Sequence, residues 1–89
     1  MSARVAAVVG VGPGIGLAVA RRFAQAGMDL ALVARDGQRL EAYREGLSAL
    51  GVAVHTCVCD VSEQYELSKT FQDIRDHLGS PEAMVYNAP

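Results

Sequence analysis

The chain has 89 residues, of which 51% are hydrophobic and 20% are charged, a composition typical of a soluble globular domain rather than of a disordered or fibrous protein. Its formal net charge is -2 and its charges do not form blocks of one sign, which argues against binding to nucleic acid or to an anionic membrane surface. We therefore expect one small domain over residues 1–89, burying about 60% of the surface of the extended chain.

The apolar run at residues 5–9 resembles neither an export signal nor a membrane span. Arg4 precedes this run, but glycines and a proline within residues 10–14 interrupt it, whereas a signal segment needs a continuous apolar helix. A transmembrane helix needs about 20 consecutive apolar residues, and the sequence has no such stretch.

The first predicted unit is a strand followed by a helix. Residues 5–9 are apolar throughout, which is typical of a parallel strand covered on both faces. From Gly14 onward, apolar side chains recur at the spacing of an amphipathic helix, and Gly27 is a natural C-terminal stop. The predicted buried stripe of this helix consists of Ile15, Ala18, Val19, Phe23 and Ala26.

The same pattern returns between residues 30 and 51. Residues 30–34 form a second apolar run, and Asp36 is placed to cap the helix that follows. Gly51 is expected to end this helix. Its predicted buried stripe consists of Leu40, Tyr43, Leu47 and Leu50.

A third strand is expected over residues 52–59 and a fourth over residues 83–86. Between them, Ser62 is predicted to cap a helix that has Glu63 in its first turn and ends at Gly79. The predicted buried stripe of this third helix consists of Leu67, Phe71, Ile74 and Leu78.

Strands that alternate with helices of this length predict parallel pairing through right-handed crossovers. The expected fold is an α/β, Rossmann-type sheet of βαβαβαβ topology, half of a doubly wound fold with strand order 3-2-1-4. In a complete doubly wound sheet the fourth strand is interior. Its outer edge is therefore expected to be bare here, which favours self-association through that edge.

The stretch VVGVGPGIG joins the first strand to the first helix. Gly10, Gly14 and Gly16 fit the spacing G-x-x-x-G-x-G, and Gly12 is an additional glycine. Such glycines permit a tight turn, let the backbone approach a phosphate and direct the N-terminus of the helix at the anion. The stretch predicts a pyrophosphate-binding turn, although a strand-to-helix turn without a ligand is sometimes equally rich in glycine.

Arg35 follows the second strand, where a dinucleotide site usually holds an acidic residue for the ribose 2′-hydroxyl. An arginine offers charge-assisted hydrogen bonds to a 2′-phosphate, so this position favours NADP(H) over NAD(H). Two alternatives stay open. In the first, Arg35 is a solvated side chain at the start of a helix. In the second, Asp36 binds the ribose, although capping is the expected role of Asp36.

Asp60 follows the third strand and Asn87 follows the fourth. With Gly10 and Arg35, they place a suitable residue at the carboxyl end of each strand, and ligands bind at this edge of an open parallel sheet. The alternatives are a turn or capping role for Asp60 and a backbone-bonding loop role for Asn87.

The two cysteines and two histidines of the chain are not predicted to form a metal site. Cys57 and Cys59 face the same way on a strand, but neither His55 nor His77 has an obvious supporting cluster. The cysteines are expected to be buried thiols, and His77 a surface residue near a helix C-terminus. Two cysteines are too few for a secreted disulfide framework, so a reducing, cytoplasmic location is expected.

With these motifs placed, the chain resembles the N-terminal half of the short-chain dehydrogenase/reductase family over nearly its whole length. The family motif T-G-x-x-x-G-[IL]-G is met by VGVGPGIG at residues 9–16, its adenine-contacting Asp-Val by Asp60 and Val61, and its N-N-A-G by YNAP at residues 86–89. The resemblance implies an NADP(H) site. The cofactor-binding residues expected from the motifs and the resemblance are Gly10, Gly12, Gly14, Ile15, Gly16, Arg35, Asp60, Val61, Asn87 and Ala88.

The chain departs from the family pattern at several motif positions. Val9 replaces a threonine that braces the turn, and Gly12 and Pro13 replace residues that often donate to the cofactor phosphates. Tyr86 and Pro89 replace the first and last residues of the N-N-A-G motif. These departures are expected to weaken cofactor binding.

The resemblance also implies a catalytic serine and a Tyr-x-x-x-Lys pair, by which the family transfers a hydride between a nicotinamide cofactor and a carbonyl or alcohol. We expect both to lie beyond these residues, with neither Tyr43 nor Tyr65 as a substitute. The chain is then a fragment of a longer oxidoreductase or a short product that binds nucleotide. The alternatives are a non-catalytic interaction module that pairs through the fourth strand, and a related sheet for another adenine-containing ligand.

Overall fold

The computed structural model describes residues 4–11, 14–60 and 63–87. Strands and helices alternate along the chain, and the first and fourth strands have the bounds expected from the sequence. The elements are β1 (Val5–Val9), α1 (Ile15–Gln25), β2 (Asp29–Ala34), α2 (Gly37–Ser48), β3 (Val54–Val58), α3 (Gln64–His77) and β4 (Ala83–Tyr86).

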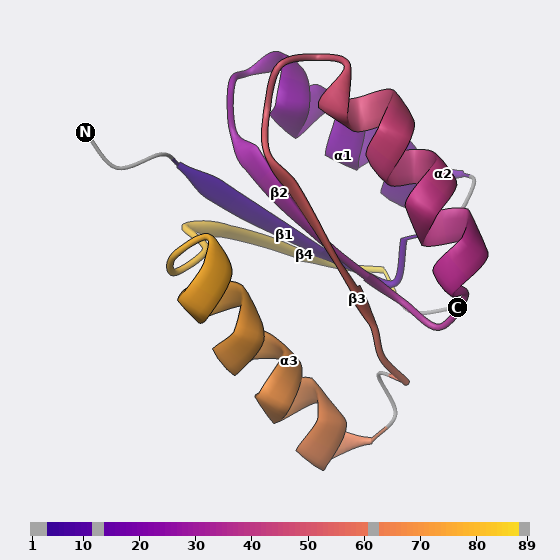
Figure 1. Cartoon of the computed structure of the whole chain (residues 1–89), viewed down its shortest axis with the longest axis vertical. Coiled ribbons are helices and arrows are strands. Elements are labelled where there is room, and N and C mark those ends of the chain that lie inside the picture. Colours follow the sequence, from indigo (N-terminus) through magenta and orange to yellow (C-terminus); the bar gives the residue numbers. More distant parts are fainter. Residues whose placement is uncertain (1–3, 12–13, 61–62, 88–89) are drawn as a thin grey trace.

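The strands form one four-stranded sheet of order β3-β2-β1-β4, and all neighbouring strands are parallel. Helices α1 and α2 cover one face and α3 lies on the other, as Figure 1 shows. This arrangement confirms the predicted Rossmann-type topology with strand order 3-2-1-4.

Two separate cores follow from the alternation of side chains along β1 and β2. Ala6 and Val8 of β1 pack under α1 and α2 with Leu40 and Leu47. The intervening residues of β1 and β2 face α3, where Ile74 is fully buried. Both faces of the central strands are therefore covered, which is why residues 5–9 read as a continuous apolar run.

The predicted buried stripe of α1 is wrong in part. The buried residues are the small ones, Gly16, Ala20 and Ala24, whereas Ile15 is 73% exposed and Ala18 and Ala26 are also exposed. Residues four apart share one helix face, and small side chains there let the helix lie close to the sheet. The prediction from the sequence favoured the larger apolar side chains of this helix, and these lie on a neighbouring face.

Two details of the other helices also differ from the expectation. In α2, Leu40 and Leu47 are buried, but Leu50 is 44% exposed because the helix ends at Ser48. In α3, Glu63 is the N-cap residue rather than part of the first turn, and its side chain makes no capping hydrogen bond. The predicted cap, Ser62, lies outside the described residues. The predicted stripe from Leu67 to Leu78 is confirmed.

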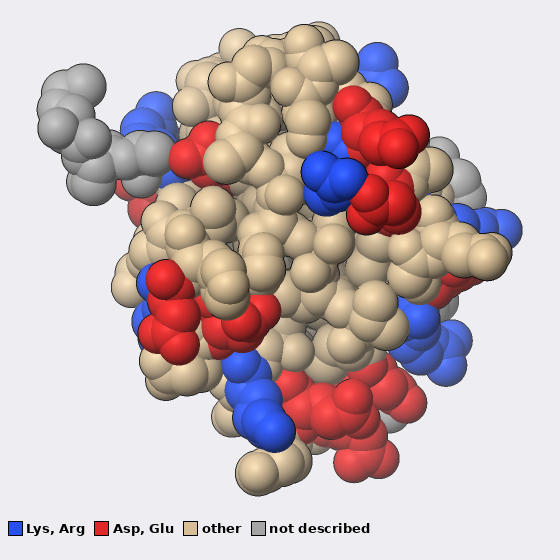
Figure 2. Space-filling view, viewed as in Figure 1, with Lys and Arg blue, Asp and Glu red and all other residues tan. Residues whose placement is uncertain are grey.

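Charged side chains of both signs lie on the face of the molecule that Figure 2 displays. Figure 2 shows Lys and Arg interspersed with Asp and Glu on the displayed face. Among the described residues in this view, the basic side chains do not join into the continuous surface that a nucleic-acid backbone requires. In the described part of the chain, none of the helices has the length and apolar character needed to cross a membrane.

Candidate functional site

The turn between β1 and α1 is tied to the end of β2. Gly10 has a φ of 85, a left-handed conformation that glycine adopts without steric cost. Its amide and that of Val11 both donate to the carbonyl oxygen of Val33, at 2.7 and 3.1 Å. The chain therefore leaves β1 sharply and keeps its backbone against the carboxyl edge of the sheet. Gly12 lies outside the described residues.

Gly16 occupies a position where an added Cβ atom would be tightly packed. A Cβ atom built there would lie 3.2 Å from Val11 Cα, 3.3 Å from the Gly10 carbonyl oxygen and 3.3 Å from Asn87 Nδ2. The backbone amide of Asn87 donates to the Val9 carbonyl at 2.8 Å, which holds the end of β4 beside the turn. The structure thus brings together Gly10, Gly16 and Asn87, which lie far apart in the sequence.

The N-terminus of α1 is open to an anion. Its N-cap residue is Gly14, which has no side chain to accept from the first amides, and the first turn holds no acidic residue. Gly14 and Ile15 are both exposed. The unpaired N–H groups and the positive end of the helix dipole together favour a negatively charged ligand.

The N-terminus of α2 is closed by its own side chain. Asp36 accepts hydrogen bonds from the amides of Gln38 and Arg39 at 3.1 and 3.2 Å and forms an ion pair with Arg39 at 3.6 Å. The predicted capping role of Asp36 is confirmed. Arg35, immediately before it, is exposed and forms no ion pair with any described residue, so its guanidinium is available to a ligand.

The remaining predicted residues at this edge are placed only in part. Asp60 is partly buried after β3, and its backbone carbonyl accepts from the amide of Glu63 at 3.0 Å, which forms the turn into α3. The structure therefore supports a turn role for Asp60, and its predicted contact with a cofactor stays a prediction. Val61 and Ala88 lie outside the described residues.

The fit of a nicotinamide dinucleotide rests on this geometry. A glycine turn that is tightly packed around Gly16 lies beside the N-terminus of α1, which no side chain caps, and a pyrophosphate binds at such a turn. The exposed arginine stands at the end of the adjacent strand, β2. A nicotinamide dinucleotide bound there would supply hydride chemistry.

One Tyr-x-x-x-Lys spacing does occur in the chain, because Tyr65 is followed by Lys69. Both lie on α3, where residues four apart are neighbours. Lys69 Nζ lies over the Tyr65 ring, 5.4 Å from its centroid, and the ring is exposed. The pair is thus a surface cation–π contact, which explains its spacing without a catalytic role.

The two cysteines are free and buried, as predicted. Burial raises the pKa of the Cys57 thiol to about 12, and the nearby Asp73 carboxylate adds to this shift. The thiolate is the nucleophilic form of cysteine, and burial disfavours this form at Cys57. Cys57 contributes packing to the core beneath α3.

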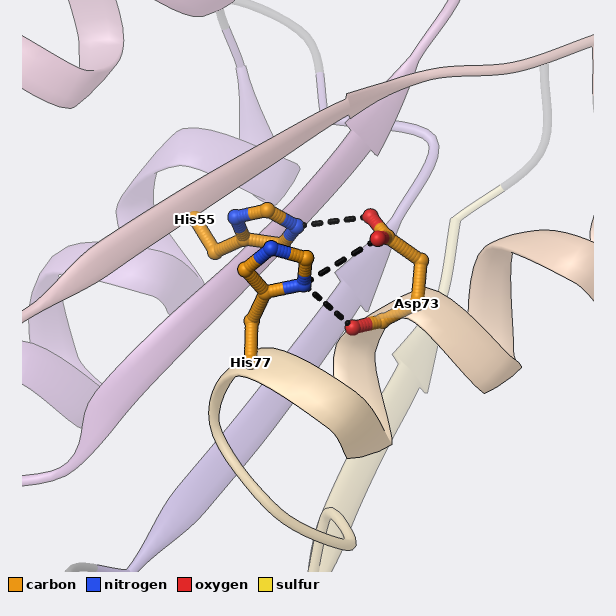
Figure 3. A group of neighbouring side chains, drawn as sticks. All are labelled: His55, Asp73 and His77. Atoms are coloured by element: carbon orange, nitrogen blue, oxygen red, sulfur yellow. Dashed lines mark hydrogen bonds and ion pairs between the residues drawn. The ribbon is translucent and has the colours of Figure 1, made fainter.

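The expectation that neither histidine has a supporting cluster is wrong. His55, Asp73 and His77 converge between β3 and α3, as Figure 3 shows. The i, i+4 spacing of Asp73 and His77 was a signal in the sequence, and the alternation of β3 put His55 on the same face as Cys57. The sequence did not show that the turn of α3 that carries Asp73 and His77 packs opposite His55.

The comparisons with known proteins agree on one family. A family model described as short chain dehydrogenase matches residues 4–89. Over 82 residues the chain is 40% identical to the 3-oxoacyl-[acyl-carrier-protein] reductase of Bos taurus, and this alignment covers 92% of the chain and 33% of that reductase.

Solved structures give the same result. The chain is similar to an L-sorbose reductase from Gluconobacter frateurii complexed with NADPH and L-sorbose, with a TM-score of 0.91, 33% identity and coverage of 100% of this chain and 34% of that one. It is also similar to an NAD+-bound xylitol dehydrogenase, with a TM-score of 0.88, 29% identity and coverage of 93% and 32%.

The chain spans about a third of the length of each of these relatives. Within that third it has the parallel sheet, the glycine turn and the open helix N-terminus. On the family match from residue 4 to residue 89, this chain belongs to the short-chain dehydrogenase/reductase family.

Proposed function

We propose that this chain binds NADP(H) and is the cofactor-binding portion of an oxidoreductase that transfers a hydride between that cofactor and a carbonyl or alcohol. The observation that carries the proposal is the open N-terminus of α1 beside the glycine turn. The catalytic serine and the tyrosine–lysine pair of the family would lie outside these residues, so the chain by itself binds cofactor without turnover.

The proposed binding residues follow the carboxyl edge of the sheet. The glycine turn and the first amides of α1 would hold the pyrophosphate. Asp60 and Val61 would contact the adenine, and Asn87 and Ala88 would also contact the cofactor, at the end of β4. The proposed contacts of the turn are Gly10, Gly12, Gly14, Ile15 and Gly16.

The preference for NADPH over NADH is proposed from Arg35 alone. Structures similar to this chain include one complexed with NADPH and one bound to NAD+, so the family likeness does not decide between the cofactors. An exposed guanidinium at the end of β2 favours the 2′-phosphate that only NADP(H) carries. A reducing, cytoplasmic location is also proposed, supported by the two free, buried cysteines.

The test is a calorimetric titration of the chain and its Arg35→Ala variant with NADPH and NADH. Loss of a charge-assisted contact should weaken NADPH binding about 10- to 100-fold and leave NADH binding nearly unchanged. Arg39→Ala is the matched control, because Arg39 pairs with Asp36 and is not assigned to the cofactor. Equal affinity of the unmodified chain for both cofactors would refute the role of Arg35.

A second candidate function is self-association through β4. This strand lies at an edge of the sheet, and Met84 and Tyr86 are 56% and 55% exposed. Unpaired edge strands favour pairing with another chain. A dimer that forms with increasing concentration in analytical ultracentrifugation, together with no affinity for NADPH, would favour this candidate over cofactor binding.

A further inference from the structure

Three side chains from two elements point their polar atoms at a common centre on the α3 face of the sheet (Figure 3). His55 Nε2 lies 2.8 Å from Asp73 Oδ2, and His77 Nδ1 lies 3.1 Å from Asp73 Oδ1. One ligand atom from each residue lies within 4.8 Å of the other two. We propose that His55, Asp73 and His77 form a binding site for one divalent transition-metal ion of the zinc class.

The fold holds these three donors in place without a metal. Asp73 and His77 are one helical turn apart on α3, so their side chains leave the same face. The imidazole rings of His55 and His77 are stacked, with centroids 4.4 Å apart and planes inclined by 15°. The stacked rings present their nitrogens to the same carboxylate, so little rearrangement is needed for all three residues to contact one ion.

The donor set indicates the class of ion. Two imidazole nitrogens and one carboxylate oxygen form a borderline ligand set that suits zinc, nickel, cobalt or copper, whereas calcium and magnesium prefer oxygen ligands. Three protein ligands leave one tetrahedral position for water. His77 and Asp73 are more exposed than His55, so an ion would enter from the solvent side of α3.

Metal binding would require a lone pair on the ring nitrogen that each histidine directs at the Asp73 carboxylate. In the hydrogen-bonded form, His55 donates from Nε2 and His77 donates from Nδ1 to the carboxylate. To bind an ion, each ring presents that nitrogen as a lone pair and carries its proton on the other nitrogen. The hydrogen bond from His77 Nδ1 to the Asp73 carbonyl, at 2.9 Å, would also be replaced by the metal bond.

The buried thiol beside the cluster is not one of the proposed ligands. Cys57 Sγ lies 3.7 Å from Asp73 Oδ2, on the core side of the carboxylate. Among the described residues, the ligand atoms that lie within 4.8 Å of one another belong to His55, Asp73 and His77 and do not include this thiol. The proposal therefore depends on the two histidines and the aspartate, and an experiment can separate them from the thiols.

The proposed metal site is distinct from the proposed cofactor site. His55 pairs in register with Ala31, which is well before the carboxyl end of β2 at Ala34. His77 is the last residue of α3, and α3 runs back toward the amino ends of the strands (Figure 1). The ion would therefore join α3 to β3 away from the edge where the dinucleotide is proposed to bind.

The experiment is a calorimetric titration of the full chain with Zn²⁺ at neutral pH under reducing conditions, with Co²⁺ absorption as a second readout. One ion per chain should bind, with a tetrahedral Co²⁺ spectrum, and Zn²⁺ should raise the unfolding temperature because it binds the folded state. His77→Gln and Asp73→Asn should each weaken binding about 10-fold or more.

Asp76→Asn is the matched control, because Asp76 is an exposed carboxylate on the same helix that pairs with Gln72. It should bind Zn²⁺ like the unmodified chain, and circular dichroism should show all three variants folded. The proposal would be overturned if His77→Gln bound Zn²⁺ as tightly as the unmodified chain, or if binding were lost only in a Cys57→Ser variant. NADPH titrations of the same variants should be unchanged, so failure of the metal site is distinguishable from failure of the cofactor site.

Discussion

Helices α1 and α2 both begin at the carboxyl edge of the same sheet, yet they begin in opposite ways. Gly14 leaves the first amides of α1 without a side-chain partner, whereas the Asp36 carboxylate caps α2. A capping carboxylate satisfies the helix start and repels a further anion. The difference shows that an anion site at a helix N-terminus depends on the absence of a capping side chain as well as on the glycines beside it.

Arg35 adds a positive charge to the carboxyl edge of the sheet, next to the carboxylate of Asp36. It lies next to a capped helix start, where its exposed guanidinium has no ion pair within the described residues. The pyrophosphate and the 2′-phosphate of an NADP(H) molecule would therefore be held by different means. The pyrophosphate would contact backbone amides, and the 2′-phosphate would contact a cationic side chain.

The largest effect is expected from giving α1 the carboxylate that α2 has. A Cβ at Gly14 meets no atom within 4 Å, so Gly14→Asp and Gly14→Asn add side chains of nearly the same shape. The aspartate should weaken NADPH binding about 10- to 100-fold relative to the asparagine, because both side chains can cap the amides but only the aspartate carries a charge that repels the pyrophosphate. Equal affinities in fluorescence titrations would place the pyrophosphate elsewhere.

A smaller effect is expected from Gly16→Ala, which adds a methyl group between the turn and Asn87. The close contacts should cost about 1–3 kcal/mol of the free energy of unfolding and weaken NADPH binding several-fold. Gly46→Ala is the control, since its Cβ meets open space on α2 and should stabilise the helix by about 0.5–1 kcal/mol. Urea unfolding measures both, and a neutral Gly16→Ala variant would contradict the close packing.

The smallest effect should come from removing the cap of α2. Asp36→Ala should lower the free energy of unfolding by about 1 kcal/mol, because the amides of Gln38 and Arg39 lose their acceptor. NADPH affinity should stay within about twofold of the unmodified chain, a change of under about 0.5 kcal/mol. A marked loss of NADPH binding would assign Asp36 to the ribose instead.

The sequence was sufficient where the local pattern and the tertiary fold agree. β1 and β4 have their predicted bounds, since each is an apolar run with breakers nearby. Asp36 was predicted as a cap because its neighbours fix that role locally. The same reasoning gave the parallel strand order, which follows from alternation of strands and helices.

The sequence was insufficient where packing between distant segments decides the outcome. The small residues of α1 are buried because the helix lies close to the sheet, so Ile15 is exposed instead. The position of Asn87 beside Gly16 and the stacking of His55 on His77 both bring together residues that are far apart in the chain. Neither arises from a local pattern, because each depends on how a strand meets a helix in three dimensions.

The most direct test of the account is a titration of the ¹⁵N-labelled chain with NADPH followed by two-dimensional NMR. Saturable shifts should appear at the amides of Gly10, Gly14 and Gly16, at Arg35 and at Asn87, while Asp73 and His77 remain unchanged. An absence of saturable shifts, or shifts confined to β4 and α3, would contradict cofactor binding at the carboxyl edge of the sheet.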